Sequence, residues 1–173
     1  KNIIVLLIDA LRPEMVSNTI TPAIDEWRIK ALQFENHFSG GTSSRMGTFS
    51  LLYGIPTTYW RTFHDNQRAS ILIDQLISYK YDVVAISSGG FGSPTLLDRT
   101  AFSQIKNLNV KKLSSSVKES NRMVTDKWMS WLSDYDRKTP FFTYLHYDLP
   151  MNSIENFDVD LIPSQFLKAK EEN

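Results

Sequence analysis

The sequence predicts an α/β fold, a mainly parallel sheet flanked by helices, because short apolar runs alternate with helical patterns. The runs cover residues 3–8, 82–87 and 141–147 and are rich in branched and aromatic side chains. Such runs are typical of strands that are buried on both faces of a parallel sheet. Strands that alternate with amphipathic helices indicate the α/β class.

Composition limits the classes of function. The chain has 173 residues, 42% of them apolar, with 19 basic and 19 acidic residues and no cysteine. Its length suits one domain, and its neutral charge gives no electrostatic support for nucleic-acid binding. The absence of cysteine excludes disulfides, thiolate metal sites and a cysteine nucleophile. Because the chain starts at Lys1, one residue before a predicted strand and without Met, we expect it to be a fragment of a longer protein.

Capping signals define the expected helices. Thr21-Pro22 predicts a helix start, and Ser116 with Glu119 forms a capping-box pattern for a helix that reaches about Asp134. Apolar spacing predicts two more helices, one whose apolar face runs from Met46 to Tyr53 and stops at Gly54, and one over residues 67–80. Residues 34–38 are expected to form a short strand or an extended piece.

Polar residues follow each predicted strand, where open α/β sheets bind ligands. Asp9 follows the first strand, residues 87–93 follow the second, and His146 and Asp148 come at the end of the third. A carboxylate such as Asp9 can bind a divalent cation, although an acid at a strand end equally serves as a turn or helix cap. His146 is the one histidine that we expect to face the site.

The segment Gly40-Gly41-Thr42-Ser43-Ser44-Arg45 is the second candidate feature. Glycines permit close approach of a ligand, and hydroxyls at a helix N-terminus suit a phosphate or sulfate. A hydroxyl there becomes a nucleophile if a metal lowers its pKa, but serine and threonine are also the commonest helix caps. Residues 88–92 match neither the G-x-G-x-x-G spacing of dinucleotide-binding loops nor the Walker spacing of phosphate-binding loops, and we interpret them as a tight turn. Lys111-Lys112 is interpreted as solvated surface.

Four stretches together resemble the alkaline phosphatase/sulfatase superfamily. NIIVLLIDALRP (residues 2–13) is similar to its first strand and metal-binding loop, and FSGGTSSRMGTFSLLYGIP (residues 38–56) to its nucleophile loop and following helix. YDVVAISSGGFGSPTLLDR and PFFTYLHYDLP match later strands in order. The narrower resemblance is to the YejM-type inner-membrane sulfatase-like proteins of Gram-negative bacteria.

The resemblance implies roles for individual residues. Asp9 would be a metal ligand, with Ser43 favoured as the nucleophile and Thr42 as the alternative. We also expect Ser44, Arg45 and His146 to contact the substrate, Arg45 on the ground of its charge and position. The resemblance further implies that residues 1–173 are the N-terminal portion of a single sulfatase/alkaline-phosphatase-like domain.

The resemblance also implies a cofactor, a substrate class and a location. The cofactor would be Mg²⁺, Mn²⁺ or Zn²⁺, with further ligands expected beyond Asn173. The implied substrate is a phospholipid or lipopolysaccharide headgroup, at the periplasmic face of the inner membrane and in a membrane-anchored parent chain.

Departures from the family pattern leave an alternative open. Gly41 and Ser43 replace the modified residue and the proline of the sulfatase motif, which excludes formylglycine chemistry and favours relatives with a hydroxyl nucleophile. Ala10 stands where a second acid is common, and Met151 where a histidine is common. The alternative is therefore a catalytically degenerate periplasmic domain that binds lipid or a protein partner and regulates envelope lipid supply.

Overall fold

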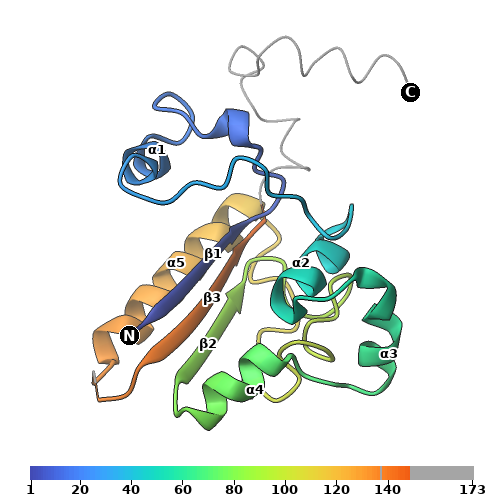
Figure 1. The fold of residues 1–173 in the computed structure, drawn as a ribbon. Coiled ribbons are helices and arrows are strands. Elements are labelled where there is room, and N and C mark those ends of the chain that lie inside the picture. Colours follow the sequence, from blue (N-terminus) through green and yellow to red (C-terminus); the bar gives the residue numbers. More distant parts are fainter. Residues whose placement is uncertain (137, 149–173) are drawn as a thin grey trace.

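A parallel sheet is the centre of the molecule. The computed structural model describes residues 1–136 and 138–148. Within this part the strands are β1 (Ile3–Ile8), β2 (Asp82–Ser87) and β3 (Phe141–Tyr147). They form a parallel sheet in the order β1-β3-β2 (Figure 1). The predicted fold class and the bounds of all three strands are confirmed.

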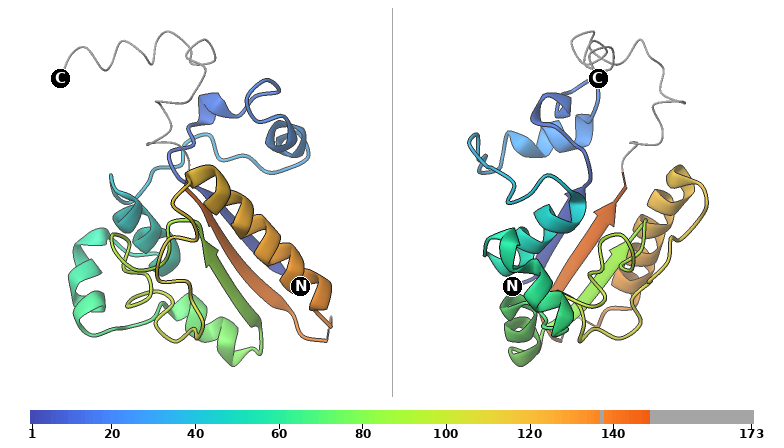
Figure 2. Two further views of the ribbon diagram at one scale, coloured as in Figure 1. Left: turned by 180° about the vertical axis from the view of Figure 1, so that it is seen from behind. Right: turned by 90° about the vertical axis from the view of Figure 1, so that its right-hand side faces the viewer.

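Helices cover both faces of this sheet. The helices of the described part, not all of which contact the sheet, are η1 (Pro13–Met15), α1 (Pro22–Arg28), α2 (Ser44–Tyr53), η2 (Thr57–Tyr59), α3 (Trp60–Asp65), α4 (Ile71–Ser78) and α5 (Val117–Asp134). Helix α5 lies on one face, whereas α2 and α4 lie on the other (Figure 2). The segment that contains α1 lies beyond the carboxyl ends of the strands (Figure 1).

The predicted caps of two helices are present. The Ser43 hydroxyl accepts a hydrogen bond from Met46 N and opens α2, which ends at Gly54 in the left-handed conformation. The Ser116 hydroxyl accepts from Glu119 N at 3.3 Å and opens α5. These side chains satisfy backbone N–H groups that have no partner within the helix.

Three local predictions need correction. Residues 34–38 form no strand; a turn occupies residues 35–36, and Phe34 and Phe38 are largely exposed because no described strand lies beside them to pair with. The helix predicted over residues 67–80 is α4 and begins at Ile71, since the Ser70 hydroxyl caps it by accepting from Ile73 N. Thr21 precedes α1, but its hydroxyl donates to Met15 O and leaves the helix uncapped.

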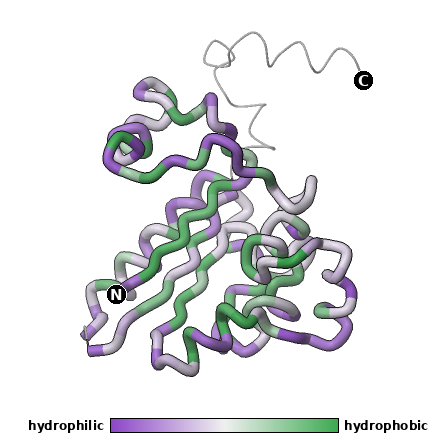
Figure 3. Tube along the Cα trace, viewed as in Figure 1, coloured by the Kyte–Doolittle hydropathy of each residue, from purple (hydrophilic) through white to green (hydrophobic). Residues whose placement is uncertain are grey.

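Two apolar clusters fix the sheet between its helices. On the α2/α4 face, Phe142 and Tyr144 of β3 pack with Val5 and Leu7 of β1. On the α5 face, Leu145 packs with residues of β2 and α5. Strand β1 is hydrophobic along its whole length (Figure 3). Both faces of β3 are therefore packed.

Candidate active site

Three potential metal ligands meet at the carboxyl ends of β1 and β3. Asp9, His146 and Asp148 each offer one ligand atom, and these atoms lie within 4.8 Å of one another. Asp9 and His146 were singled out from the sequence, but Asp148 was not singled out as a ligand. The same signal identifies Asp148, because it is also an acid at the end of a buried strand.

Strand periodicity explains why these side chains converge. Side chains two residues apart lie on the same face of a strand. His146 therefore continues the face of Tyr144, and Asp9 continues the face of Leu7, which is paired with His146. Asp9 N donates to Tyr147 O at 2.9 Å and so extends the ladder by one residue. All three ligands thus lie on the α2 side of the sheet.

His146 is the most deeply buried member of the group. Its side chain is 2% exposed, and neither ring nitrogen has a hydrogen-bond partner among the described residues. Burial lowers the pKa of His146, although the carboxylates of Asp148 and Asp9 act in the opposite direction. A neutral imidazole with a free nitrogen is the form that binds metals. A buried ring without partners beside two carboxylates fits a divalent cation.

Asp9 links the ligand group to helix α2. Its Oδ2 accepts a hydrogen bond of 2.9 Å from the Ser44 hydroxyl, and its Oδ1 accepts from Ala10 N at 3.1 Å. Ala10 has a φ of 57°, a left-handed conformation that is unusual for a residue with a side chain. This turn redirects the chain directly after the ligand, and such local strain is common at functional sites.

Asp148 is fixed through its backbone. Its N–H donates to the Ser88 hydroxyl at 2.7 Å, and its carbonyl accepts from Asn121 Nδ2 at 2.6 Å. The carboxylate lies against Gly89, where an added Cβ would come within 2.4 Å of Asp148 Oδ2. Gly89 therefore leaves room for the carboxylate.

The three neighbouring hydroxyls have different environments. Ser44 is half-buried, lines the cavity described below and contacts Asp9. Ser43 and Thr42 are exposed, and the Ser43 hydroxyl caps α2. The resemblance favours Ser43 as the nucleophile, with Thr42 as the alternative, and assigns Ser44 to substrate contact. The geometry brings Ser44, rather than Ser43 or Thr42, to the candidate metal ligands.

Arg45 lies in the wall beside the site. Its Nε donates to Pro94 O at 2.5 Å, and its guanidinium lies 4.9 Å from the centre of the Trp60 ring. It is not among the residues that line the cavity. In this arrangement Arg45 connects α2 to the loop around Pro94 through its Nε.

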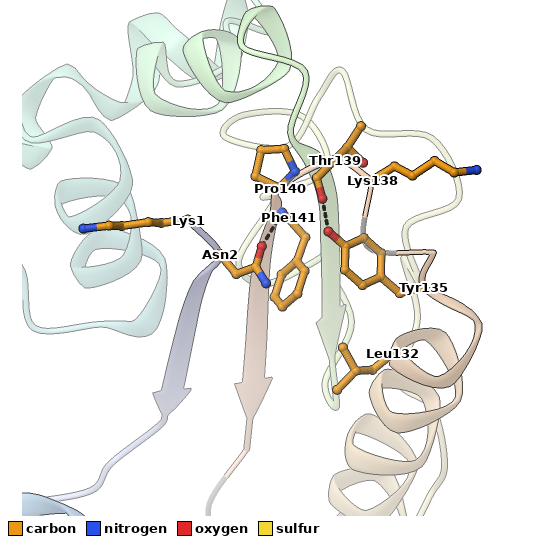
Figure 4. Close-up of a pocket in the computed structure, with 8 residues that line it drawn as sticks. All are labelled: Lys1, Asn2, Leu132, Tyr135, Lys138, Thr139, Pro140 and Phe141. Atoms are coloured by element: carbon orange, nitrogen blue, oxygen red, sulfur yellow. Dashed lines mark hydrogen bonds between the residues drawn. The ribbon is translucent and has the colours of Figure 1, made fainter.

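A cavity of about 590 Å³ opens over these groups. Asp9, Ser44, His146 and Asp148 line it together with Lys111 and Lys112. A second cavity of about 560 Å³ lies at the amino ends of β1 and β3, where Asn2 Oδ1 accepts from Phe141 N (Figure 4). Among the described residues, no group of three potential ligands lies there. The carboxyl-end cavity is therefore the candidate active site.

Comparison with known proteins agrees with this architecture. The sulfatase family matches residues 1–150. The chain therefore belongs to the sulfatase family, a family of hydrolases within the alkaline phosphatase/sulfatase superfamily whose members generally use a divalent metal.

Three relatives show moderate similarity. An uncharacterized protein of Haemophilus influenzae is 25% identical over 98% of this chain and 28% of its own length. The inner membrane protein YejM of Salmonella typhimurium, like that of Salmonella typhi, is 25% identical over 78% of this chain and 22% of its own. The chain thus spans about a quarter of the length of these relatives. No helix among its described residues is long and apolar enough to cross a membrane.

Proposed function

We propose that this chain is part of a metal-dependent hydrolase or phosphotransferase that acts on phosphoesters, with sulfoesters less favoured, through a serine hydroxyl. The observation that carries the proposal is the hydrogen bond between Ser44 Oγ and Asp9 Oδ2, inside a cavity that also holds His146 and Asp148. A hydroxyl beside a metal-ligand group is the arrangement of an activated oxygen nucleophile.

Asp9, His146 and Asp148 would hold the cation. One imidazole and two carboxylates suit Zn²⁺ or Mn²⁺ better than Mg²⁺, which prefers oxygen ligands and retains its waters. When bound, the metal would lower the pKa of the serine hydroxyl and neutralise charge on the ester oxygens. Further ligands from the rest of the parent protein would complete its coordination.

The chain's own residues would carry the group transfer. Ser44 Oγ forms a bond to phosphorus while the bond from phosphorus to the leaving alcohol breaks. The hydroxyl proton leaves through Asp9, its hydrogen-bond acceptor, to solvent, and the leaving alcohol on the opposite side of phosphorus takes a proton from water. Water in a hydrolase, or an acceptor hydroxyl in a transferase, then replaces Ser44 at phosphorus. Asp9 therefore orients the nucleophile as well as binding the cation.

The other substrate roles remain part of the proposal. Ser43 and Thr42 are the alternative nucleophiles, and Arg45 would position α2 against Pro94 rather than contact the anion directly. We also propose that the parent chain is anchored in the inner membrane, with this domain at the periplasmic face and a phospholipid or lipopolysaccharide headgroup as substrate. The similarity to the inner membrane protein YejM supports this location.

The test is hydrolysis of chromogenic phosphate monoesters and diesters, and of a sulfate ester, by the full-length protein with Zn²⁺, Mn²⁺ or Mg²⁺. Wild type is compared with Asp9→Ala, Ser44→Ala and the control Ser43→Ala. Phosphoester turnover that is lost in Asp9→Ala and Ser44→Ala, but kept in Ser43→Ala, is the expected result. Equal activity in wild type and Ser44→Ala would reject Ser44 as the nucleophile.

A second candidate function is non-catalytic. In this alternative the domain binds a lipid or a protein partner and regulates envelope lipid supply. The stretch after α1 favours it, because Ile29, Leu32, Phe34 and Phe38 are each at least 75% exposed. An inert wild-type protein in the ester panel, with every metal, would make binding the leading function.

A further inference from the structure

We propose that Lys111 and Lys112 are the anion-binding side chains of this cavity and select a doubly charged phosphate monoester group over a singly charged sulfate ester. The inference rests on the proposed phosphoester function, because it concerns the same cavity. Both lysines line that cavity together with Asp9, Ser44, His146 and Asp148. Both lysines are exposed, as the interpretation of the pair as solvated surface expects, and the proposal adds a role to them.

The backbone around the two lysines is held in place. Phe91 N donates to Asn109 O at 2.9 Å, Gly92 N donates to Val110 O at 3.0 Å, and Leu113 N donates to Ser88 O at 3.1 Å. Residues 109–113 therefore run along the loop that follows β2, and these bonds bracket the lysines. Their location at the cavity is a property of the fold rather than of a free surface loop.

The Asn109 side chain forms hydrogen bonds that connect the lysine segment to the end of β2. Its Nδ2 donates to Ser87 O at 2.6 Å and to Lys111 O at 3.2 Å, while its Oδ1 accepts from Ser87 N. One amide thus joins the carbonyl of Lys111 to the last residue of the strand. This contact fixes the distance between the lysine backbone and the carboxyl end of the sheet.

Two glycines make this close approach possible. An added Cβ at Gly90 would lie 2.6 Å from Val110 O and from Lys111 C, and Gly90 also has a φ of 84°. An added Cβ at Gly92 would lie 2.8 Å from Val110 O. The Gly-rich loop lacks the spacing of a nucleotide loop, but it allows the lysine segment to pack against β2.

Charge balance identifies the class of ligand. The carboxylates of Asp9 and Asp148 offset the charge of one divalent cation between them. Lys111 and Lys112 then leave an excess of two positive charges in the cavity. A phosphate monoester dianion neutralises this excess, whereas a sulfate ester or phosphate diester carries one negative charge and leaves half of it. Among the envelope lipids proposed as substrates, the lysines would therefore favour headgroups that end in a phosphate monoester over phosphodiester headgroups. Lysine is a common point-charge ligand for phosphate.

The test measures binding rather than turnover. Phenylphosphonate and benzenesulfonate are inert analogues with two charges and one, and calorimetry with the Mn²⁺-loaded full-length protein at about pH 8.5 keeps lysine protonated. The variants are Lys111→Gln/Lys112→Gln, the charge-preserving Lys111→Arg/Lys112→Arg and the control Lys106→Gln, an exposed lysine outside the cavity.

We expect wild type to bind phenylphosphonate at least about ten-fold more tightly than benzenesulfonate. The double glutamine variant should weaken phenylphosphonate binding by about ten- to hundred-fold, the range for lost hydrogen bonds to charged groups, and should reduce the preference. The double arginine variant and Lys106→Gln should retain the preference for phenylphosphonate.

The inference is overturned if the double glutamine variant binds phenylphosphonate like wild type, if both ligands weaken equally, or if wild type has no preference. Failure of the proposed function gives a different result: lysine-dependent binding of phenylphosphonate without turnover of any ester. Turnover that depends on Ser44 but not on either lysine rejects only the assignment of the lysines.

Discussion

Strand β1 is wholly aliphatic and its parallel neighbour β3 includes Thr143 and His146, yet β3 is the more buried of the two. Six of the seven residues of β3 are buried, whereas no residue of β1 is fully buried. Leu145 of β3 is 3% exposed, but its register partner Leu6 is 53% exposed. Helix α5 packs on β2 and β3, and among the described residues no helix packs on this face of β1. Position in the sheet, rather than composition, decides burial.

The difference extends to the candidate site. His146 follows five buried residues of β3 and is itself buried, so its position is determined by packing on both faces. Asp9 follows a strand that packs on one face only, and two further contacts fix it: the ladder bond to Tyr147 O and the hydrogen bond from Ser44. The two halves of the ligand group are therefore held by different interactions.

The largest expected effect tests the burial contrast directly. Phe142→Ala should lower the free energy of unfolding by about 3–5 kcal/mol, because it leaves a cavity beneath β3. Leu6→Ala, the matched control on β1, should cost less than about 1 kcal/mol because half of its side chain is already in water. Denaturant unfolding of the chain measures both. Equal losses would mean that another segment covers β1.

The next effect concerns the metal. Loss of a residue that only hydrogen-bonds to a metal ligand typically lowers metal affinity by roughly 10- to 100-fold. His146→Ala should lower divalent-metal affinity by more than this, because it removes a ligand itself. Asp9→Ala should have a comparable effect, although Asp9 lies at the less buried strand. Titration calorimetry with Zn²⁺ and Mn²⁺ on the full-length protein measures this, with His37→Ala as an exposed control. Unchanged affinity in His146→Ala would remove it from the ligand group.

A smaller effect is expected from the loop beside β2. Gly90→Ala should destabilise the fold by about 1–3 kcal/mol, because the residue has a positive φ and a Cβ would meet the backbone of Lys111. Gly54→Ala is the matched control: its φ is also positive, at 66°, but a Cβ would meet nothing within 4 Å. Thermal unfolding should therefore show a smaller loss for Gly54→Ala. Equal losses of stability in the two variants would mean that the positive φ alone, and not the contact with the Lys111 backbone, causes the destabilisation.

The smallest effect separates two adjacent serines. Ser43→Ala removes the cap of α2 and should cost about 1 kcal/mol of stability while turnover persists. Ser44→Ala should leave stability nearly unchanged and abolish turnover. Unfolding and activity assays on the same preparations give both values. A Ser43→Ala protein that is stable but inactive would reverse the two roles.

Much of this architecture could be predicted from the sequence. The three strands are short runs rich in branched and aromatic residues, and their bounds agree with the prediction. Burial on both faces, which such runs also predict, holds for β3 but not for β1 within the described part of the chain. Residues 34–38 have two phenylalanines but also a glutamate, an asparagine and a histidine, and in the described part they have no pairing partner. Pairing is a tertiary property that so short and mixed a pattern does not determine. The late start of α4 depends on Ser70, a cap that the apolar pattern alone did not indicate.

The site was predictable in part. Asp9 and His146 were found from their positions at strand ends, and Asp148 follows from the two-residue period of a strand. The choice among three consecutive hydroxyls depends on how α2 is docked, which local sequence does not determine. Lys111 and Lys112 could not be assigned, because their approach to the cavity depends on glycines about twenty residues earlier that also fit a simple turn.

The most direct test of the central claim is to trap the covalent intermediate on the full-length protein. A chromogenic phosphate monoester is mixed with the metal-loaded protein, the reaction is quenched in acid, and the peptide containing residues 42–45 is sequenced by mass spectrometry. The account predicts one phosphate group on Ser44 in wild type and none in Asp9→Ala. Phosphate on Ser43 or Thr42, or turnover with no labelled peptide, would contradict it.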